Sequence, residues 1–274
     1  MKINKEQLKW TREPKQYSIS EDKIEIITNP HTDLWQRTYY HFRNDNAPVL
    51  QMKTSEKFFS FVVKTEFEGK VRFDQCGIVM YLDSENWLKG SIEYENEEFQ
   101  HLGSVVTNNG YSDWATTEID AGIKSMWYRF SRREDDYCIE CSEDGIKYKQ
   151  MRICHVYKAN DEIQFGIYAC SPENSSFKAT FTNMELTECK WLTHDGQAPD
   201  KKQKFRFNEE VLYMKKSISR IIGVIMLIVA IVFIMFALNH PEKSFPWNNT
   251  ITWLLYGVYF LVAVVLLIAP KMKK

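Results

Sequence analysis

The chain has 274 residues, with 35 Lys and Arg residues against 36 Asp and Glu residues, and a formal net charge of -1. This length allows one large domain or two smaller ones. The balanced charge excludes the basic excess that is typical of nucleic-acid-binding proteins. Aromatic residues make up 14% of the chain, which favours a β-rich core or a surface on which ligands stack.

Residues 1–194 consist of short runs in which apolar and polar side chains alternate, without a sustained helical period. Turn-forming Asn, Asp, Gly and Pro residues separate these runs. Strands are expected at Lys23–Thr28, Thr38–Phe42, Lys57–Phe67, Cys76–Leu82, Trp87–Tyr94, Gln100–Thr107, Asp113–Ile119, Met126–Arg132, Tyr137–Cys141, Lys147–Ile153, Glu162–Ala169 and Phe177–Glu188. Strands at such near-even spacing predict an all-β domain, either a two-sheet sandwich or a barrel.

The segment 74–95, DQCGIVMYLDSENWLKGSIEYE, predicts a hairpin with two different faces. Its even-numbered apolar residues are expected in the core: Cys76, Ile78, Met80, Leu82, Leu88, Ile92 and Tyr94. Residues that face each other across a hairpin share a face, so the loop must hold an odd number of residues, either 83–85 or 83–87. With the shorter loop, Tyr81 faces Trp87, Val79 faces Lys89 and Gln75 faces Glu93. Gly77 then leaves a gap between Lys89 and Glu93.

The composition changes near residue 200, where a basic segment leads into two charge-free apolar stretches, 221–238 and 251–269. Each stretch has roughly the length that a helix needs to cross a hydrocarbon layer of ~30 Å. A buried pair of soluble helices is the alternative, and the lack of any charge on an outer face argues against it. The sequence therefore predicts a β-sandwich at 1–194, a basic linker at 195–217 and two transmembrane α-helices within 218–274.

The charged residues beside the apolar stretches predict the orientation of this hairpin. Lysines and arginines precede the first stretch and follow the second, whereas the loop between the two stretches holds only Lys243. The positive-inside rule then places both ends in the cytoplasm and the short loop outside. The N-terminus lacks the apolar region of a secretory signal peptide, which agrees with this orientation. The expected location is the cell membrane, with the lipid bilayer as a partner.

Neither the cysteines nor the histidines form a pattern that is typical of a metal or redox site. Cys138 and Cys141 form a C-x-x-C pair, but on the expected strand they would point to opposite faces. The six histidines show no i, i+2 or i, i+4 pairing. We therefore expect six reduced structural thiols, no metal and no cofactor.

Five blocks occur in a fixed order along the chain: TDLWQRTYYHFRNDNAPVL (32–50), the hairpin 74–95, SVVTNNGYSDW (104–114), WYRFSRREDDYCIECSEDGIKY (127–148) and GIYACSP (166–172). Together they resemble a bacterial and fungal family of domains of unknown function that includes the regulation-of-enolase protein. This family belongs to the concanavalin A-like lectin/glucanase superfamily. The resemblance covers about residues 5–190 and implies a jelly-roll sandwich of two curved antiparallel sheets. It implies no agreed activity, and it does not extend to the apolar hairpin.

Sandwiches of this superfamily commonly bind sugars on the concave sheet, and the resemblance implies such a site here. Sugar recognition combines an aromatic platform for the C–H face of the ring with planar polar groups for the hydroxyls. The expected ligand-binding residues are Trp35, Tyr81, Trp87 and Trp114 as platforms, with Gln36, Gln75, Lys89, Glu93 and Arg129 as polar partners. The alternative is that Lys89 and Glu93 form a solvated ion pair and that the tryptophans only pack.

Two other functions remain as alternatives to a binding module. A regulatory protein-interaction module for a metabolic enzyme fits the enolase regulator in the family. A glycoside hydrolase-like enzyme is the third reading, because catalytic members of the superfamily carry Glu-x-Asp-x-x-Glu. Here Glu118 and Asp120 lack the last carboxylate, which retaining hydrolysis needs, so no catalytic residue is predicted. The expected partners are a sugar or phosphosugar, a metabolic enzyme and the bilayer, without nucleic acid.

Overall fold

The computed structural model describes residues 3–159 and 161–192, together with 223–232, 234–235, 239, 254, 256–259 and 261. The chain divides into two units, Met1–Asp195 and Gly196–Lys274. Each unit is described by itself.

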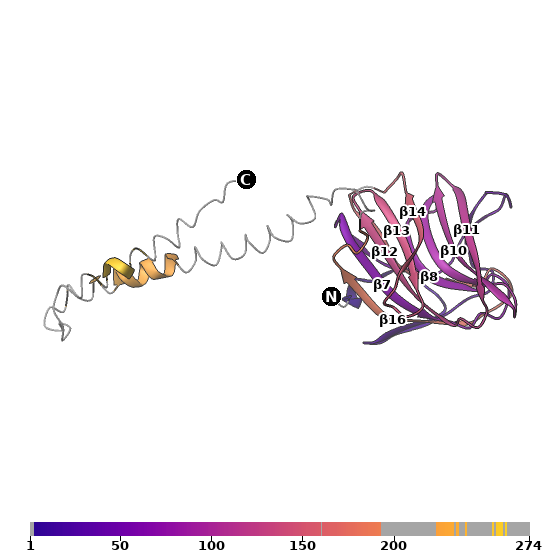
Figure 1. The fold of residues 1–274 in the computed structure, drawn as a ribbon, viewed down its shortest axis with the longest axis horizontal. Coiled ribbons are helices and arrows are strands. Elements are labelled where there is room, and N and C mark those ends of the chain that lie inside the picture. The colour runs from indigo at the N-terminus through magenta and orange to yellow at the C-terminus, as the bar shows by residue number, and fades with distance from the viewer. Residues whose placement is uncertain are drawn as a thin grey trace. The chain divides into compact units, whose positions relative to one another are not determined.

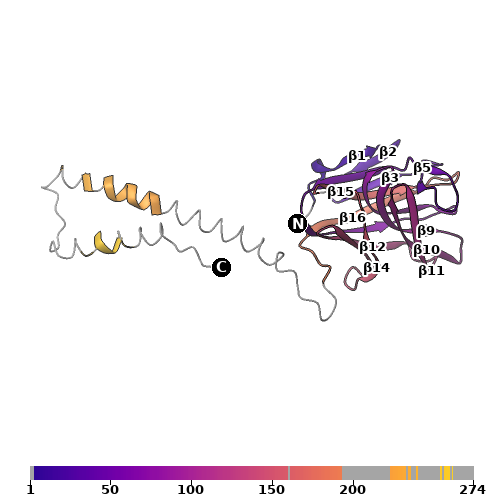
Figure 2. The ribbon, with the colours of Figure 1, turned by 90° about the horizontal axis from the view of Figure 1, so that it is seen from above.

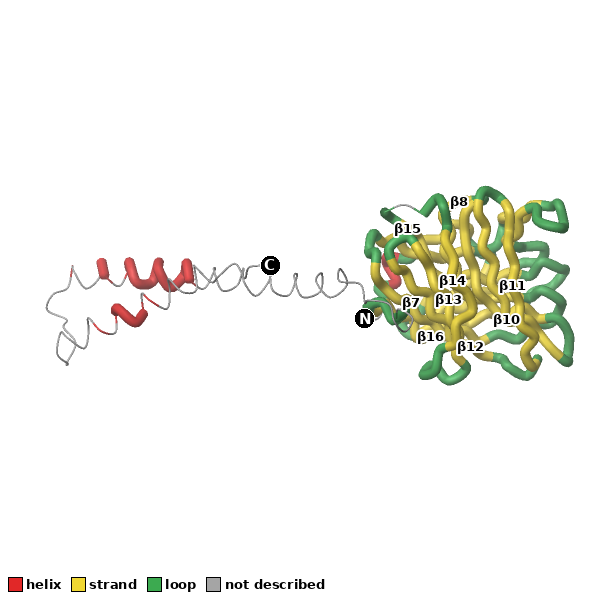
Figure 3. The backbone as a smooth tube through the Cα atoms, turned by 45° about the horizontal axis from the view of Figure 1, so that its top comes forward, coloured by secondary structure: helices red, strands yellow, loops and turns green. Residues whose placement is uncertain are grey.

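The first unit is a sandwich of two seven-stranded antiparallel sheets (Figure 1). The sheet called here the β8 sheet contains, in spatial order, β1 (Lys9–Arg12), β6 (Val49–Thr54), β15 (Ile163–Cys170), β8 (Gln75–Asp83), β9 (Asn86–Tyr94), β10 (Phe99–Asn108) and β11 (Tyr111–Asp120). The β7 sheet contains β14 (Lys149–His155), β13 (Asp136–Ser142), β12 (Ser125–Arg133), β7 (Phe58–Glu66), β16 (Lys178–Thr187), β3 (Lys23–Ile27) and β2 (Gln16–Ile19). The strand pattern left a sandwich or a barrel open, and the structure is the sandwich that the family resemblance implies. Figure 3 shows how much of the unit is strand.

Two short elements complete the unit. The 3-10 helix η1 (Lys5–Gln7) lies near the N-terminus, where the Asn4 side chain caps it by accepting a hydrogen bond from Glu6 N–H. Strands β4 (Leu34–Gln36) and β5 (Arg43–Asp45) form a separate two-stranded sheet. This small sheet belongs to the segment that covers the candidate site.

The main core fills the space between the two sheets. In the β8 sheet it takes the even-numbered residues of β8 and β9, as the hairpin pattern predicts, including Ile78, Met80 and Ile92. The β7 sheet contributes a group of aromatic rings, among them Phe61 and Phe130, which pack against Phe165 of the opposite sheet. Each fully buried aromatic or aliphatic side chain of this kind stabilises the fold by ~1.5–3 kcal/mol relative to its exposed state.

The predicted strands agree with the structure along most of the unit but fail around residue 40. The segment Thr38–Phe42, predicted as a strand, forms the loop between β4 and β5. Tyr39 and His41 adopt positive φ angles of 60° there, and a residue in that conformation cannot continue a strand. The adjacent strand β6 (Val49–Thr54) was not predicted, although it joins β1 to β15 inside the β8 sheet. Strands β1 and β2, which Figure 2 labels, were not predicted either.

In the second unit, residues 223–232 are helical. Among the residues that the structure describes, no helix is long and apolar enough to cross a membrane, since a spanning helix needs ~20 apolar residues. This finding overturns the predicted transmembrane hairpin and the membrane localisation that depended on it. Of the first predicted span, 221–238, the structure describes 223–232 and 234–235, and of the second, 251–269, it describes 254, 256–259 and 261. The remaining residues of both spans lie outside the described part of the chain.

Candidate functional site

From Gln75 to Tyr81, the hairpin formed by β8 and β9 pairs in the register of the shorter predicted loop. The loop itself differs from the prediction, because the register shifts after Tyr81 and Asp83 pairs with Asn86, which leaves only residues 84–85 in the loop. Tyr81 lies opposite Trp87, Val79 opposite Lys89 and Gln75 opposite Glu93. The odd-numbered side chains therefore share the outer face of the β8 sheet, away from the main core. This face is not solvated, because β9 is buried from Asn86 to Glu93.

A covering segment, residues 29–47, lies over this outer face and includes β4 and β5. It forms a second apolar cluster with the sheet, which consists of Leu34, Trp35, Ala47, Val49, Val79, Tyr81, Trp87, Val105, Tyr168 and Cys170. Trp114 packs against the cluster from β11. The charged residues of the β9 face are consequently enclosed between a sheet and a covering layer, where electrostatic interactions are stronger than in water.

Between the covering segment and the sheet lies a cavity of about 400 Å³, called here the covered cavity. Its aromatic lining consists of Trp35, Tyr40, Phe42, Phe73 and Trp114. Its charged lining consists of Asp33, Lys89, Glu93 and Glu173, and Asn44, Gln75, Val105 and Pro172 complete it. Apolar walls with a few convergent polar groups, in a cavity of this size, are typical of small-molecule sites.

Lys89 lies at the bottom of this arrangement and is only 2% exposed. Its ammonium donates a hydrogen bond to Gln75 Oε1 (2.7 Å) and lies 3.6 Å from Asp33 Oδ1. Burial alone would lower the pKa of Lys89, but the negative charges of Asp33 and Glu93 outweigh burial and raise it. The lysine is therefore a buried cation that makes one hydrogen bond and one ion pair with the protein's own acceptors.

Glu93 differs from Lys89 because its carboxyl group has no such partner. It is 4% exposed and lines the covered cavity, yet among the described residues its carboxyl makes neither a hydrogen bond nor an ion pair within 4 Å. Burial raises the pKa of Glu93 to about 7, the nearby charges of Asp33 and Glu95 add to this effect, and Lys89 opposes it. An enclosed carboxyl without a partner is costly to the folded protein unless a donor satisfies it.

Gly77 does not leave an empty gap between Lys89 and Glu93. A Cβ atom at this position would collide with the Gly90 carbonyl oxygen, so the glycine permits close approach of the two strands. Tyr168 and Ser91 flank Gly77 in the ladder, and the Tyr168 hydroxyl lies 2.8 Å from Ser91 Oγ. The Tyr168 side chain therefore reaches across β8 to Ser91 at the position of Gly77.

Five of the residues predicted to bind ligand line the covered cavity together: Trp35, Gln75, Lys89, Glu93 and Trp114. They come from the covering segment and from β8, β9 and β11. The Trp114 indole lies over Gly103 of β10, where a Cβ atom would be 3.2 Å from the indole nitrogen. That nitrogen is buried and has no hydrogen-bond acceptor among the described residues.

Tyr81 and Trp87 lie on the same face but outside the cavity lining. The Tyr81 hydroxyl donates to the Asp45 carboxylate (2.8 Å) and accepts from Arg12 (3.2 Å). Burial raises the pKa of Tyr81 to about 12. Trp87 is fully buried, and its indole donates to the Ser84 carbonyl oxygen (3.3 Å). Both side chains support the second apolar cluster rather than present a ring to a ligand.

Gln36 and Arg129 do not line the covered cavity. Gln36 is buried in β4, where its backbone N–H donates to Ser112 Oγ (2.9 Å). Arg129 belongs to β12 of the other sheet and forms a bidentate ion pair with Glu140, with N–O distances of 2.6 and 2.7 Å. These two residues therefore do not belong to the site that we describe.

The lining also contains residues that the sequence did not single out, chiefly Asp33, Tyr40, Phe42 and Phe73. The run of aromatic residues at 39–42 is the signal that could have identified them, because Tyr39, Tyr40 and Phe42 remain substantially exposed in the loop. Predicting this run as a strand concealed its position at the edge of a cavity.

Arg37 attaches the covering segment to the turns of the β8 sheet. Its guanidinium donates to the Gly110 carbonyl oxygen (2.9 Å) and to Glu85 (3.1 Å), and it lies over the Tyr111 ring. Gly110 has a φ of 74°, and a Cβ atom there would collide with Arg37. Glycine is therefore required at this turn both for its backbone conformation and for the docking of the arginine.

The incomplete hydrolase motif lies outside the covered cavity. Glu118 and Asp120 are exposed on β11, and neither lines the cavity. Asp120 accepts a hydrogen bond from Gly122 N–H (2.6 Å), which accounts for its carboxylate as a turn-stabilising group.

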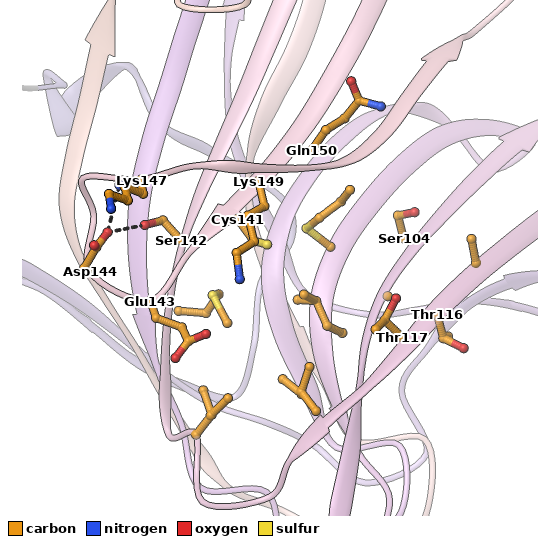
Figure 4. A pocket seen from close by; sticks show the side chains of 17 residues that line it. Ser104, Thr116, Thr117, Cys141, Ser142, Glu143, Asp144, Lys147, Lys149 and Gln150 are labelled. Atoms are coloured by element: carbon orange, nitrogen blue, oxygen red, sulfur yellow. Dashed lines mark hydrogen bonds between the residues drawn. The ribbon is translucent and has the colours of Figure 1, made fainter.

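A larger cavity of about 660 Å³, the edge cavity, lies between β10 and β11 of one sheet and β13 and β14 of the other (Figure 4). The Asp144 carboxylate accepts from the N–H groups of Lys147 and Ile146 and from the Ser142 hydroxyl, which lowers its pKa to about 2. No buried side-chain atom without a hydrogen-bond partner belongs to the described lining of this cavity. We therefore place the candidate site in the smaller, covered cavity.

Comparison with known proteins gives relatives for the first unit. The chain is 31% identical over 179 residues to Regulation of enolase protein 1 of Saccharomyces cerevisiae, covering 65% of this chain and 88% of that protein. A crystal structure of a functionally unknown protein from Saccharomyces cerevisiae is 29% identical, with a TM-score of 0.63. That similarity covers 68% of this chain and 98% of the solved chain.

More distant structures share the fold alone. The GH43 BlXynB protein from Bacillus licheniformis is 17% identical with a TM-score of 0.54, and the similarity covers 66% of this chain and 37% of that chain. A xylan beta-1,4-xylosidase from Bacillus halodurans C-125 is 12% identical with a TM-score of 0.51, covering 69% and 38% of the two chains. Residues 10–189 match the family described as "Protein of unknown function (DUF1349)". The chain therefore belongs to the DUF1349 family.

Proposed function

We propose that this chain is a regulatory binding protein whose covered cavity takes a small, carbohydrate-like polar ligand. The homology to yeast Regulation of enolase protein 1 suggests a regulatory role. The observation that carries the binding proposal is the Glu93 carboxyl, which has no hydrogen bond or ion pair among the described residues and lies in a cavity lined by aromatic rings. Rings that contact the C–H face of a sugar, beside polar groups that bind its hydroxyls, form the usual pattern of sugar recognition.

The charges of the cavity discriminate between the two predicted ligand types. Three carboxyl groups, those of Asp33, Glu93 and Glu173, line the cavity with one lysine. Lys89 already interacts with Gln75 and Asp33. A phosphate group would add negative charge beside these carboxylates, which is unfavourable in an enclosed site. The proposal therefore favours a sugar without phosphate over a phosphosugar.

A thermal-shift screen of the full chain against neutral sugars and phosphosugars tests this proposal. We expect a rise in melting temperature with at least one neutral sugar, because a ligand that binds only the folded state stabilises it. The Trp114→Ala variant should lose this rise, whereas Tyr157→Ala, which removes an exposed ring outside the cavity lining, should keep it. The absence of stabilisation by any sugar, or an unchanged rise in Trp114→Ala, would overturn the proposal.

A protein-interaction role is the second candidate, and the exposed aromatic residues of the covering segment favour it. Tyr39 is 81% exposed, Tyr40 45% and Phe42 44%. Neighbouring rings of this kind are enriched in protein interfaces. If the partner is a metabolic enzyme, Tyr39→Ser combined with Phe42→Ser should abolish its regulation without changing the melting temperature of the chain. Unchanged regulation in this double variant would exclude the loop as the contact surface.

A further inference from the structure

The covered cavity combines an excess of negative charge with an aromatic wall. Its lining holds Asp33, Glu93 and Glu173 against Lys89. Lys89 donates to Gln75 Oε1 and lies beside Asp33. The positive charge of the lining is thus directed at the protein's own groups, whereas the Glu93 carboxyl, at 4% exposure, has no hydrogen bond or ion pair among the described residues.

The rings of this wall stand at steep angles to one another. The planes of Trp35 and Trp114 are 82° apart with centroids at 6.2 Å, and those of Trp35 and Tyr40 are 74° apart with centroids at 5.5 Å. Rings that meet at such angles present faces and edges from several directions to one enclosed space. The electron-rich faces of Trp and Tyr attract cations, and aromatic enclosures are a recurring way to bind ammonium groups.

The lining residue Trp114 carries a second buried polar atom, which lies beside Gly103 of β10. The indole nitrogen of Trp114 is buried and donates to no described residue. Since an indole N–H can only donate, its complement is a ligand oxygen. The complement of the Glu93 carboxylate is an N–H or O–H donor, and a charged donor makes the stronger bond.

From this arrangement we infer that the ligand is an amino sugar or a similar hydroxylated amine, bound with its protonated nitrogen at Glu93 and a hydroxyl at Trp114. The inference rests on the proposed function and specifies its ligand class. Glu93 supplies the charge that selects the amine, Trp35 and Tyr40 supply ring faces, and the Trp114 indole N–H supplies the bond to oxygen. Neutral sugars of the same shape lack the charge and bind more weakly.

Isothermal titration of the full chain with glucosamine, glucose and N-acetylglucosamine tests this inference, because the three differ at one substituent. Glucosamine carries an ammonium group where glucose carries a hydroxyl and N-acetylglucosamine an uncharged amide. We expect glucosamine to bind about tenfold more tightly than either neutral sugar, which is the contribution of roughly one charge-assisted hydrogen bond. Equal affinities, or tighter binding of glucose, would overturn the inference.

Two variants connect the preference to the site. Glu93→Gln keeps the shape of the side chain but removes its charge, so it should abolish the preference for glucosamine while retaining the affinity for glucose. Glu97→Gln removes an exposed carboxylate outside the cavity lining and should leave the preference unchanged. A preference that persists in Glu93→Gln would contradict the role of this residue, provided that the melting temperature shows a folded variant.

The outcomes also separate this inference from the proposed function. If neutral sugars bind and glucosamine has no advantage, the proposed sugar site stands and the amine inference fails. If none of the three ligands binds and the wider sugar screen is negative as well, both fail. If Trp114→Phe, which keeps a ring but removes the N–H, binds glucosamine as tightly as the parent chain does, the hydroxyl contact at Trp114 fails while the amine contact stands.

Discussion

The two faces of the hairpin formed by β8 and β9 have the same backbone but different environments. The even face packs into the main core with aliphatic residues such as Ile78 and Ile92. The odd face is equally buried, but it carries Lys89 and Glu93 under the covering segment. The difference shows that burial by itself does not distinguish a core face from a binding face. What marks a binding face is a buried polar group whose hydrogen bonds the rest of the protein does not satisfy.

The largest effect is expected for Lys89→Met. It leaves the buried Asp33 without its ion-pair partner and removes the positive charge that acts on Glu93, and removing one partner of a buried charge pair typically costs ~3–5 kcal/mol. Chemical denaturation should show this loss as a lower free energy of unfolding. Adding Asp33→Asn should recover part of it. A loss below ~1 kcal/mol would indicate a solvated pair and would remove the distinction between the two faces.

On the even face, Ile92→Ala should lower the free energy of unfolding by ~2–5 kcal/mol, because it creates a cavity in the main core. Ligand preference should not change, since this side chain points away from the covered cavity. Chemical denaturation and titration with glucosamine and glucose check the two parts. An altered preference at unchanged fold would show that the two faces are coupled.

Glu93→Gln should stabilise the protein in a pH-dependent way. The folded-state pKa of about 7 lies above the ordinary value of 4.5, so the folded state binds more protons than the unfolded state between these two values. Stability of the parent chain therefore falls as pH rises through this window, by at most ~3 kcal/mol. The groups around the carboxyl are Lys89, Asp33 and Glu95, with His101 opposite in the ladder.

Denaturation of both proteins at pH 4, 6 and 8 measures this effect. The advantage of the glutamine variant should be smallest at pH 4 and should grow up to about pH 7. An advantage that does not depend on pH would contradict the assignment of a raised pKa to Glu93.

The smallest effect is expected at the attachment of the covering segment. Gly110→Ala forces a residue with a Cβ atom into a φ of 74° and displaces Arg37, which should cost ~1 kcal/mol. Hydrogen exchange in residues 37–42 should become faster while β9 stays protected. Arg37→Ala is the matched variant, since it removes the same contact without backbone strain. Unchanged exchange in both variants would show that Arg37 does not hold the segment.

The residue pattern predicted an all-β domain, either a sandwich or a barrel, and narrowed the register of the hairpin for physical reasons, whereas the resemblance to the family implied the sandwich. Alternation with period two distinguishes the faces of a strand, and the parity of the loop limits the register to two choices, one of which the structure adopts. The position of Trp35 and Trp114 in one cavity follows from tertiary contacts between distant segments. The prediction that these two tryptophans share one site came from the resemblance of the chain to the superfamily, not from the residue pattern.

The covering segment could not be predicted in the same way. Its loop contains Arg37, Tyr39 and His41 at positive φ, a conformation that residues other than glycine adopt rarely and that leaves no clear mark in a sequence. Since the covering segment could not be predicted, the sequence was compatible with Lys89 and Glu93 either in a ligand site or in an exposed ion pair. The apolar stretches at 221–238 and 251–269 led to a different error, because length and hydropathy alone predicted spans that no described helix supports.

The most direct test of the account is the carbon-13 resonance of the Glu93 carboxyl group in the full chain, recorded by NMR during titration with glucosamine. If the amine binds at Glu93, the Glu93 signal should show a saturable change and the signal of the exposed Glu97 should not change. Titration with pH in the absence of ligand should give a midpoint near the pKa of about 7. A Glu93 signal that does not respond to the ligand, with a midpoint at the ordinary value of 4.5, would contradict the claim that this buried carboxyl forms a binding site.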